Sequence, residues 1–195
     1  MKNIFTFYIL LLLGFFLNAQ NLKSPDNNLD LNFSIDEKGR AFYSLNFHDE
    51  PVILNSGLGF MLKDNVEWMK IDTLDMMNNF KILNVTFDSV DEYWNPVWGE
   101  ESEIRNNYNE MFVELQQIES ERKVNIRFRL FDDSLGFRYE FPLQEKLGSF
   151  IIIDEKTEFA MAGDHTAVWI PGDYDTQEYN YTTSKLSEIE QKSIE

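Results

Sequence analysis

The sequence predicts an all-β fold, an antiparallel sandwich, and three observations lead to this prediction. Short runs of alternating apolar and polar residues recur along the chain, and turn-forming residues separate them. Aromatic residues make up 15% of the chain, including 17 Phe, and aromatic side chains favour strands. After the N-terminal segment, no stretch keeps apolar residues at helical spacing over three turns. Many short strands joined by turns are typical of a sandwich.

The first two predicted strands form a hairpin. Residues 29–35 and 43–47 alternate apolar with polar side chains, and residues 37–40 between them have turn chemistry. Gly39 can adopt the left-handed backbone conformation that such a turn needs. We therefore expect one face of this hairpin to lie in the core and the other to face solvent.

The next segment predicts shorter strands and one loop. We expect a short third strand at residues 52–54, ended by the turn-forming residues 55–57, with alternation resuming over residues 58–62. Residues 64–79 are polar and irregular, which predicts a loop. Residues 80–90 return to strand character.

The clearest hairpin joins residues 124–130 to residues 135–141 through a turn at 132–134. Residues 111–115 alternate in the strand before it. The alternation predicts that the side chains facing inward in the hairpin are Val124, Ile126, Phe128, Phe137 and Tyr139. We also expect cross-strand ion pairs with neighbouring acids for Arg105, Arg127, Arg129 and Arg138.

The last third of the chain predicts two more strands and a turn. Residues 150–153 are continuously apolar, which is typical of a strand buried on both faces. Residues 167–170 form a short apolar run that Pro171 and Gly172 end. Residues 184–195 are expected to form a helical turn or a linker.

The N-terminus has the features of a targeting signal. Lys2 precedes an apolar stretch at residues 4–16, and Ala19 provides a small residue for cleavage. The stretch is shorter than the ~20 residues that span a bilayer, which disfavours a membrane anchor. We expect residues 1–19 to be a cleaved signal peptide and residues 20–195 to be one domain, exported to the periplasm of a Gram-negative host.

Composition excludes several classes of function. The formal net charge of −17 argues against nucleic acids and anionic membranes as partners. The absence of Cys excludes disulfides and thiolate metal sites. Only two histidines occur, and neither lies in a His-Glu-x-x-His motif. Glycoside hydrolysis needs two carboxyl groups about 5–10 Å apart, and nothing in the sequence selects such a pair.

Two stretches carry side chains that suit a ligand. Residues 173–181 bring carboxylates next to tyrosines, namely Asp173, Asp175 and Glu178 with Tyr174, Tyr179 and Tyr181. Such a set suits a polyhydroxylated ligand or a hard cation, and the alternative is a solvated acidic loop. Trp94, Trp98 and Glu100 could stack on and hydrogen-bond a sugar; the alternative is aromatic packing over the sandwich core.

Four motifs occur in order along the chain: WNPVWGE at residues 94–100, EIRNNYNE at 103–110, residues 128–141 ending in GFRYEF, and residues 169–189. Together they resemble the N-terminal domain of glycoside hydrolase family 97, a family of inverting α-glucosidases and retaining α-galactosidases. The match runs from about residue 24 to residue 189 and is closest to the periplasmic α-glucosidases of starch-utilisation systems.

The resemblance implies a β-super-sandwich similar to galactose mutarotase. It places the catalytic residues in a downstream (β/α)₈ barrel, so we expect none in this chain, which ends at Glu195 inside the sandwich. It implies a calcium-dependent enzyme that acts on α-linked oligosaccharides, with the barrel as the partner of this domain. Glu188 matches the family's glutamate that reaches into the barrel's active site and ligates Ca²⁺.

Two other functions stay open at the level of sequence. One is a stand-alone carbohydrate-binding module, and the other is a truncated product without function. The sequence does not separate α-glucosidase from α-galactosidase, because that choice is made in the barrel; closeness of the match favours α-glucosidase.

Overall fold

The computed structural model describes residues 19–64, 73–172 and 178–189. The predicted signal peptide therefore lies almost wholly outside the described residues. Within them the chain forms, in order, β1 (Gln20–Lys23), β2 (Leu29–Ile35), β3 (Ala41–Phe47), β4 (Glu50–Leu58), β5 (Phe60–Asp64), β6 (Thr73–Met76), β7 (Phe80–Trp94), β8 (Ile104–Gln117), β9 (Lys123–Leu130), β10 (Leu135–Glu140), β11 (Phe150–Glu155), β12 (Thr166–Trp169), β13 (Thr182–Lys185) and the 3₁₀ turn η1 (Leu186–Glu188). No helix in these ranges is long and apolar enough to cross a membrane.

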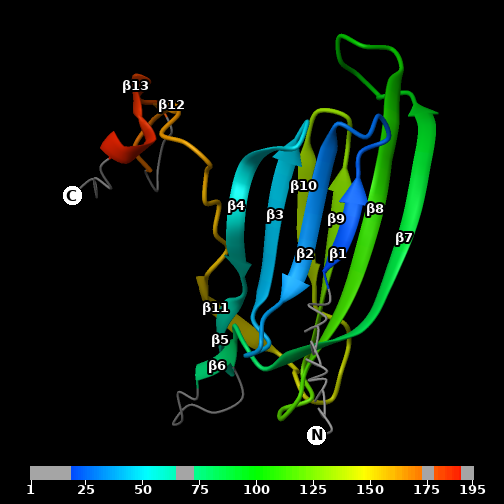
Figure 1. Ribbon diagram of the computed structural model, residues 1–195, viewed down its shortest axis with the longest axis vertical. Helices are drawn as coiled ribbons and strands as arrows, with labels where there is room; N and C mark the ends of the chain where they lie inside the picture. The colour runs from blue at the N-terminus through cyan, green and yellow to red at the C-terminus, as the bar shows by residue number, and fades with distance from the viewer. Residues whose placement is uncertain (1–18, 65–72, 173–177, 190–195) are drawn as a thin grey trace, which may run out of the picture.

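Two antiparallel four-stranded sheets face each other and form the body of the protein (Figure 1). Their strand orders are β1-β2-β3-β4 and β10-β9-β8-β7. Rings from the two sheets meet in the core: the ring centroids of Phe33 and Phe128 lie 5.8 Å apart, and those of Tyr43 and Phe137 lie 5.4 Å apart. The predicted all-β antiparallel sandwich is confirmed.

The β2–β3 hairpin follows the alternation in the sequence. Leu31 and Phe33 of β2 and Tyr43 of β3 are buried, while the residues between them are partly exposed. Gly39 has φ of +68°, and a Cβ there would come within 2.4 Å of the Phe80 backbone nitrogen. The turn therefore needs glycine for its conformation and for the close approach of a second chain segment.

The β9–β10 hairpin also has the predicted register. Phe128 pairs with Phe137 and Ile126 with Tyr139. Phe128 and Ile126 are buried, and Phe137 and Tyr139 are half-buried against the core because β10 lies at the edge of its sheet. The prediction that these side chains face inward is confirmed.

The sequence prediction is wrong for two segments near the start of the chain. Residues 55–57 do not end a strand, because β4 runs unbroken from Glu50 to Leu58. Register shifts opposite Leu45 let the pairing continue past this polar stretch. The buried hydroxyl of Ser56 donates to Leu54 O and accepts the N–H of Ala160, so burial of this polar side chain is compensated.

Part of the predicted loop at residues 64–79 is also a strand. β6 pairs with β5, and Met76 at its end is buried. The apolar signal is short, and pairing with a neighbouring strand determines the structure where local propensity is weak.

The prediction that residues 150–153 are buried on both faces is wrong. β11 lies at the edge of the small sheet β11-β5-β6, and Ile151, Ile152 and Ile153 are each about half exposed. Only Phe150 packs closely inward, with its ring centroid 4.7 Å from that of Phe141. The continuous apolar run thus correctly predicts a strand here, but it does not predict how deeply the strand is buried.

After β11 the chain runs beside β4 and then leaves the sandwich. Backbone hydrogen bonds join Glu158 N to Gly57 O at 2.9 Å and Leu54 N to Ala160 O at 2.7 Å. The chain then reaches the two-stranded sheet of β12 and β13, which Figure 1 shows apart from the two main sheets. This small hairpin carries the residue for which the sequence suggests a role in metal binding.

Candidate functional site

The β12–β13 hairpin is a small, internally bonded unit. Its strands pair from Thr166 opposite Lys185 to Trp169 opposite Thr182. The indole Nε1–H of Trp169 donates to the hydroxyl of Ser184 at 3.0 Å, which ties a large side chain to the opposite strand. The strand predicted at residues 167–170 is confirmed, and so is a helical turn after residue 184, since η1 directly follows β13.

Glu188 lies exposed at the end of the η1 turn. The turn is closed by the N–H of Leu186, which donates to His165 O at 3.0 Å, and by the N–H of Ile189, which donates to Leu186 O at 3.2 Å. One carboxylate oxygen of Glu188 accepts the N–H of Lys185 at 2.9 Å. These bonds hold the Glu188 side chain on a fixed backbone while leaving it open to solvent.

Asp164, which lies just before β12, anchors the same turn, because Thr166 of β12 pairs with Lys185 at this end of the hairpin. The two carboxylate oxygens of Asp164 accept the backbone N–H and the hydroxyl of Ser187, each at 2.9 Å. The backbone hydrogen bond from Ser187, followed by the hydroxyl bond, lowers the pKa of Asp164 below its ordinary value because both favour the ionised form. Sequence reasoning missed this residue, because the two partners are 23 positions apart and no local pattern links them.

The turn by itself is not a complete cation site. No group of three or more His, Cys, Asp or Glu side chains that could hold a metal occurs among the residues described. Ca²⁺ takes six to eight oxygen ligands. Glu188 fits as one ligand, being an exposed carboxylate on a constrained turn, and the remaining oxygens would have to come from outside the described part of the chain.

The acidic and aromatic stretch predicted between β12 and β13 is only partly described. Asp173, Tyr174 and Asp175 lie outside the described residues. Glu178 and Tyr181 lie within them and are exposed. The hypothesis of a ligand site at residues 173–181 therefore stays a hypothesis.

Trp94 and Trp98 do not pack over the sandwich core, so that interpretation is wrong. The side chain of Trp98 is 89% exposed and that of Trp94 is 50% exposed. The reason is strand length: β7 and β8 have 15 and 14 residues, whereas β2 and β3 of the facing sheet have seven each. The β7–β8 hairpin consequently extends beyond the sandwich, as Figure 1 shows in green.

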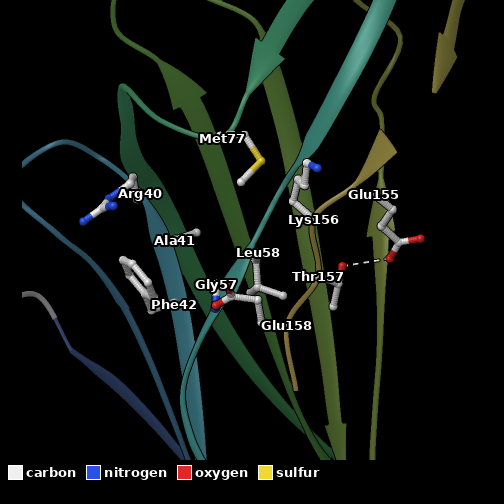
Figure 2. Close-up of a pocket in the computed structure, with 10 residues that line it drawn as sticks. All are labelled: Arg40, Ala41, Phe42, Gly57, Leu58, Met77, Glu155, Lys156, Thr157 and Glu158. Carbon is white, nitrogen blue, oxygen red and sulfur yellow. Dashed lines mark hydrogen bonds between the residues drawn. The ribbon is translucent and has the colours of Figure 1, made fainter. Parts of the chain in front are cut away.

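A shallow cleft of about 390 Å³ lies where the segment after β11 passes β3 and β4 (Figure 2). Its charged groups already have partners. Glu158 accepts the N–H of Gly57 at 2.8 Å, Thr157 donates to Glu155 at 2.8 Å, and the Arg40 guanidinium pairs with Asp36 at 2.6 Å. These contacts attach the segment after β11 to the sheet. The cleft therefore has a structural role and is not a good candidate for a reaction site.

The outer face of the second sheet carries most of the predicted ion pairs. Glu110 is buried between Arg127 and Arg129, and Arg129 Nε lies 2.8 Å from it. Glu140 accepts hydrogen bonds from Arg127 and Arg138, at 2.7 and 2.8 Å. The bond from Arg127 is the main reason that the pKa of Glu140 is lowered. Arg105 pairs with Asp91 of the neighbouring strand. The expected cross-strand pairing is thus confirmed for Arg105, Arg127 and Arg129, whereas Arg138 pairs with Glu140 of its own strand, β10.

Comparisons with known proteins agree on one group of enzymes. The family model described as glycosyl-hydrolase 97 N-terminal matches residues 22–195. A retaining α-galactosidase from Bacteroides thetaiotaomicron is 25% identical, over 89% of this chain and 25% of that enzyme.

Solved structures give the same result. A glycoside hydrolase family 97 enzyme from Pseudoalteromonas sp., in complex with panose, aligns with a TM-score of 0.76 and 34% identity over 87% of this chain and 25% of its own. Its complex with acarbose aligns with a TM-score of 0.74 and 34% identity over 85% and 24%. A β-arabinopyranosidase, 21% identical, shares the fold with a TM-score of 0.70 over 84% and 26%. The chain thus spans about a quarter of the length of these relatives.

Proposed function

Because the chain belongs to glycoside hydrolase family 97, as an N-terminal domain of that family, we propose that it supports the active site of an exported, calcium-dependent α-glucosidase that hydrolyses starch-derived oligosaccharides. In this proposal the domain does not itself cleave the substrate. It supplies one ligating carboxylate, Glu188, to an active site formed mainly by a second domain.

The substrate class is supported by the relatives. The family member with the higher identity, 34%, is the one whose structures hold panose and acarbose. The identity to the retaining α-galactosidase is lower, at 25%. Panose is built from α-linked glucose units, and this chemistry favours an α-glucosidase over an α-galactosidase.

The η1 turn is the observation that carries the proposed role of Glu188. A carboxylate contributed across a domain interface has to be exposed and held on a fixed backbone, since a mobile ligand loses conformational entropy on binding. Glu188 meets both requirements: its side chain is exposed, and Asp164 and Lys185 hold the backbone and the carboxylate in place. When bound, Ca²⁺ would polarise reacting groups or orient a carboxylic acid near the scissile bond.

The two main sheets have a supporting role in this proposal. Their core, built around Phe33, Tyr43 and Phe128, provides a rigid base from which the hairpin extends. Cleavage requires a pair of carboxyl groups about 5–10 Å apart across the sugar. We assign that pair to the part of the enzyme that lies beyond the quarter of the relatives' length covered here.

A substitution at Glu188 tests the proposal. In the full-length enzyme, we expect Glu188→Gln to weaken Ca²⁺ binding, measured by isothermal titration calorimetry, and to lower kcat on maltose. The melting temperature without Ca²⁺ should stay near that of the parent, because the side chain is exposed. Glu119→Gln is the matched control, since Glu119 is an exposed glutamate in the turn between β8 and β9. Unchanged Ca²⁺ affinity and rates in Glu188→Gln would show that Glu188 is ordinary surface.

A second experiment tests the division of labour. The chain of residues 20–195 alone should not hydrolyse maltose or aryl α-glucosides. Turnover by this purified chain that disappears when one of its own carboxylates is substituted would contradict the assignment of catalysis to another domain.

A further inference from the structure

The β7–β8 hairpin ends in an apolar tip that projects beyond the sandwich. We call residues 94–103 the arm tip. The side chain of Val97 is fully exposed, that of Trp98 is 89% exposed and that of Trp94 is half exposed. A contiguous patch of exposed apolar side chains is typical of a binding surface, whereas single exposed apolar residues are common on any protein. The green hairpin at the top of Figure 1 shows how far this tip lies from the core.

The arm tip is a constrained structure. The side-chain amide of Asn95 donates to Ser102 O at 2.8 Å, which closes the loop across its base. Just below, Arg105 donates to both carboxylate oxygens of Asp91, at 2.7 and 2.8 Å. Strand pairing is regular from Asn84 opposite Glu114 up to Trp94 opposite Ile104, where the loop begins. The tryptophan rings are therefore presented on a fixed support, which reduces the entropy lost when a ligand binds.

The side chains around the rings select the kind of ligand. Three exposed glutamates, Glu100, Glu101 and Glu103, lie in the same loop as Trp98 and directly follow it in the sequence. Carboxylates accept hydrogen bonds from hydroxyl groups, and the face of an indole ring packs against the C–H groups of a sugar ring. The cores of protein–protein interfaces are instead depleted in glutamate, and the net charge of −17 disfavours an anionic ligand.

We propose that the arm tip is a binding platform for neutral α-linked oligosaccharides, with Trp98 and Trp94 stacking on sugar rings and Glu100 accepting hydrogen bonds from their hydroxyls. The platform is separate from the η1 turn, since it is formed by a different hairpin. The inference rests on the proposed function for the class of sugar, and it gives the domain a role in holding the oligosaccharide.

The experiment is a nuclear magnetic resonance titration of the ¹⁵N-labelled chain, residues 20–195, with maltotriose. We expect the indole N–H signals of Trp98 and Trp94 to shift with a common affinity. The indole N–H of Trp169 is an internal reference, because it donates to Ser184 within the other hairpin and should not move.

Three variants sharpen the test. Trp98→Ala should weaken binding by about two- to tenfold, the range expected for the loss of one stacked ring, and Trp98→Phe should retain part of the affinity. Val97→Ala removes a neighbouring exposed side chain without an aromatic face and should bind like the parent. All three should keep the parent's melting temperature, because these side chains lie outside the core.

The outcomes separate this inference from the proposed function. Equal binding by the parent and Trp98→Ala, or no shift at Trp98 up to saturating maltotriose, would overturn the platform. If an α-galactoside shifts the Trp98 and Trp94 signals and maltotriose does not, the arm tip binds sugar, and the proposed α-glucosidase function is contradicted. If Trp98 in the full-length enzyme resists acrylamide quenching with and without sugar, a second protein domain covers the tip, and the platform is refuted.

Discussion

Phe128 lies where the two sheets meet, and its replacement by alanine should be the most damaging single truncation in the core. The side chain is fully buried. Its ring centroid lies 5.8 Å from that of Phe33, 6.4 Å from that of Tyr43 and 5.7 Å from that of Phe137. These neighbours belong to β2, β3 and β10, so a cavity at Phe128 would touch both sheets.

The size of the effect follows from the packing. Truncating a buried Phe to Ala costs about 3–5 kcal/mol, and the cost is highest where the surroundings cannot collapse into the cavity. The neighbouring rings are fixed on strands that pair on both sides or pack against the opposite sheet, which limits such relaxation. We expect Phe128→Ala to lose about 4 kcal/mol, out of a total that is about 5–15 kcal/mol for a typical domain.

Urea unfolding followed by circular dichroism measures this loss. Phe87→Ala is the matched control, because Phe87 lies on β7 with its side chain 54% exposed, and it should lose far less. A loss of under about 1 kcal/mol for Phe128→Ala, or one equal to that of the control, would refute the reasoning that both sheets close on this ring.

Three further predictions concern a turn, an ion pair and processing. Gly39→Ala should lower the unfolding free energy by more than about 1 kcal/mol, because φ there is +68° and the new Cβ would meet the Phe80 backbone. The control Gly136→Ala, at a site with open space around it, should lower the unfolding free energy less. Equal losses for the two variants in urea melts would contradict the prediction. The pKa of Glu140 is lowered below its ordinary value of 4.5, so its stabilising effect is present above that pH and lost as pH falls through the folded-state pKa. Glu140→Gln should thus unfold at lower urea than the parent at pH 7, with a gap that closes on acidification; a gap independent of pH would count against the ion pair. Mass spectrometry of protein from its host should find an N-terminus at or near Gln20, and an intact Met1 would rule out cleavage of the signal peptide.

Some features could be predicted from the sequence because they depend on local periodicity. Alternation in residues 29–35 and 124–141 determines which side chains share a face, since successive side chains of a strand point to opposite sides. That rule placed Phe33 and Phe128 in the core correctly. Similarity of the four motifs identified the family, and periodicity contributed nothing to the roles of Glu188 and Ca²⁺, which stay predictions.

What the sequence left undecided is which strand faces and edges are covered. The apolar run at residues 151–153 is a strand, and its position at a sheet edge leaves it half exposed. Trp98 is exposed because β7 and β8 are longer than the strands facing them, and Asp164 reaches Ser187 because the β12–β13 hairpin brings distant positions together. Burial depends on which elements face one another and how long each is, and these relations between remote segments are set only when the whole chain packs.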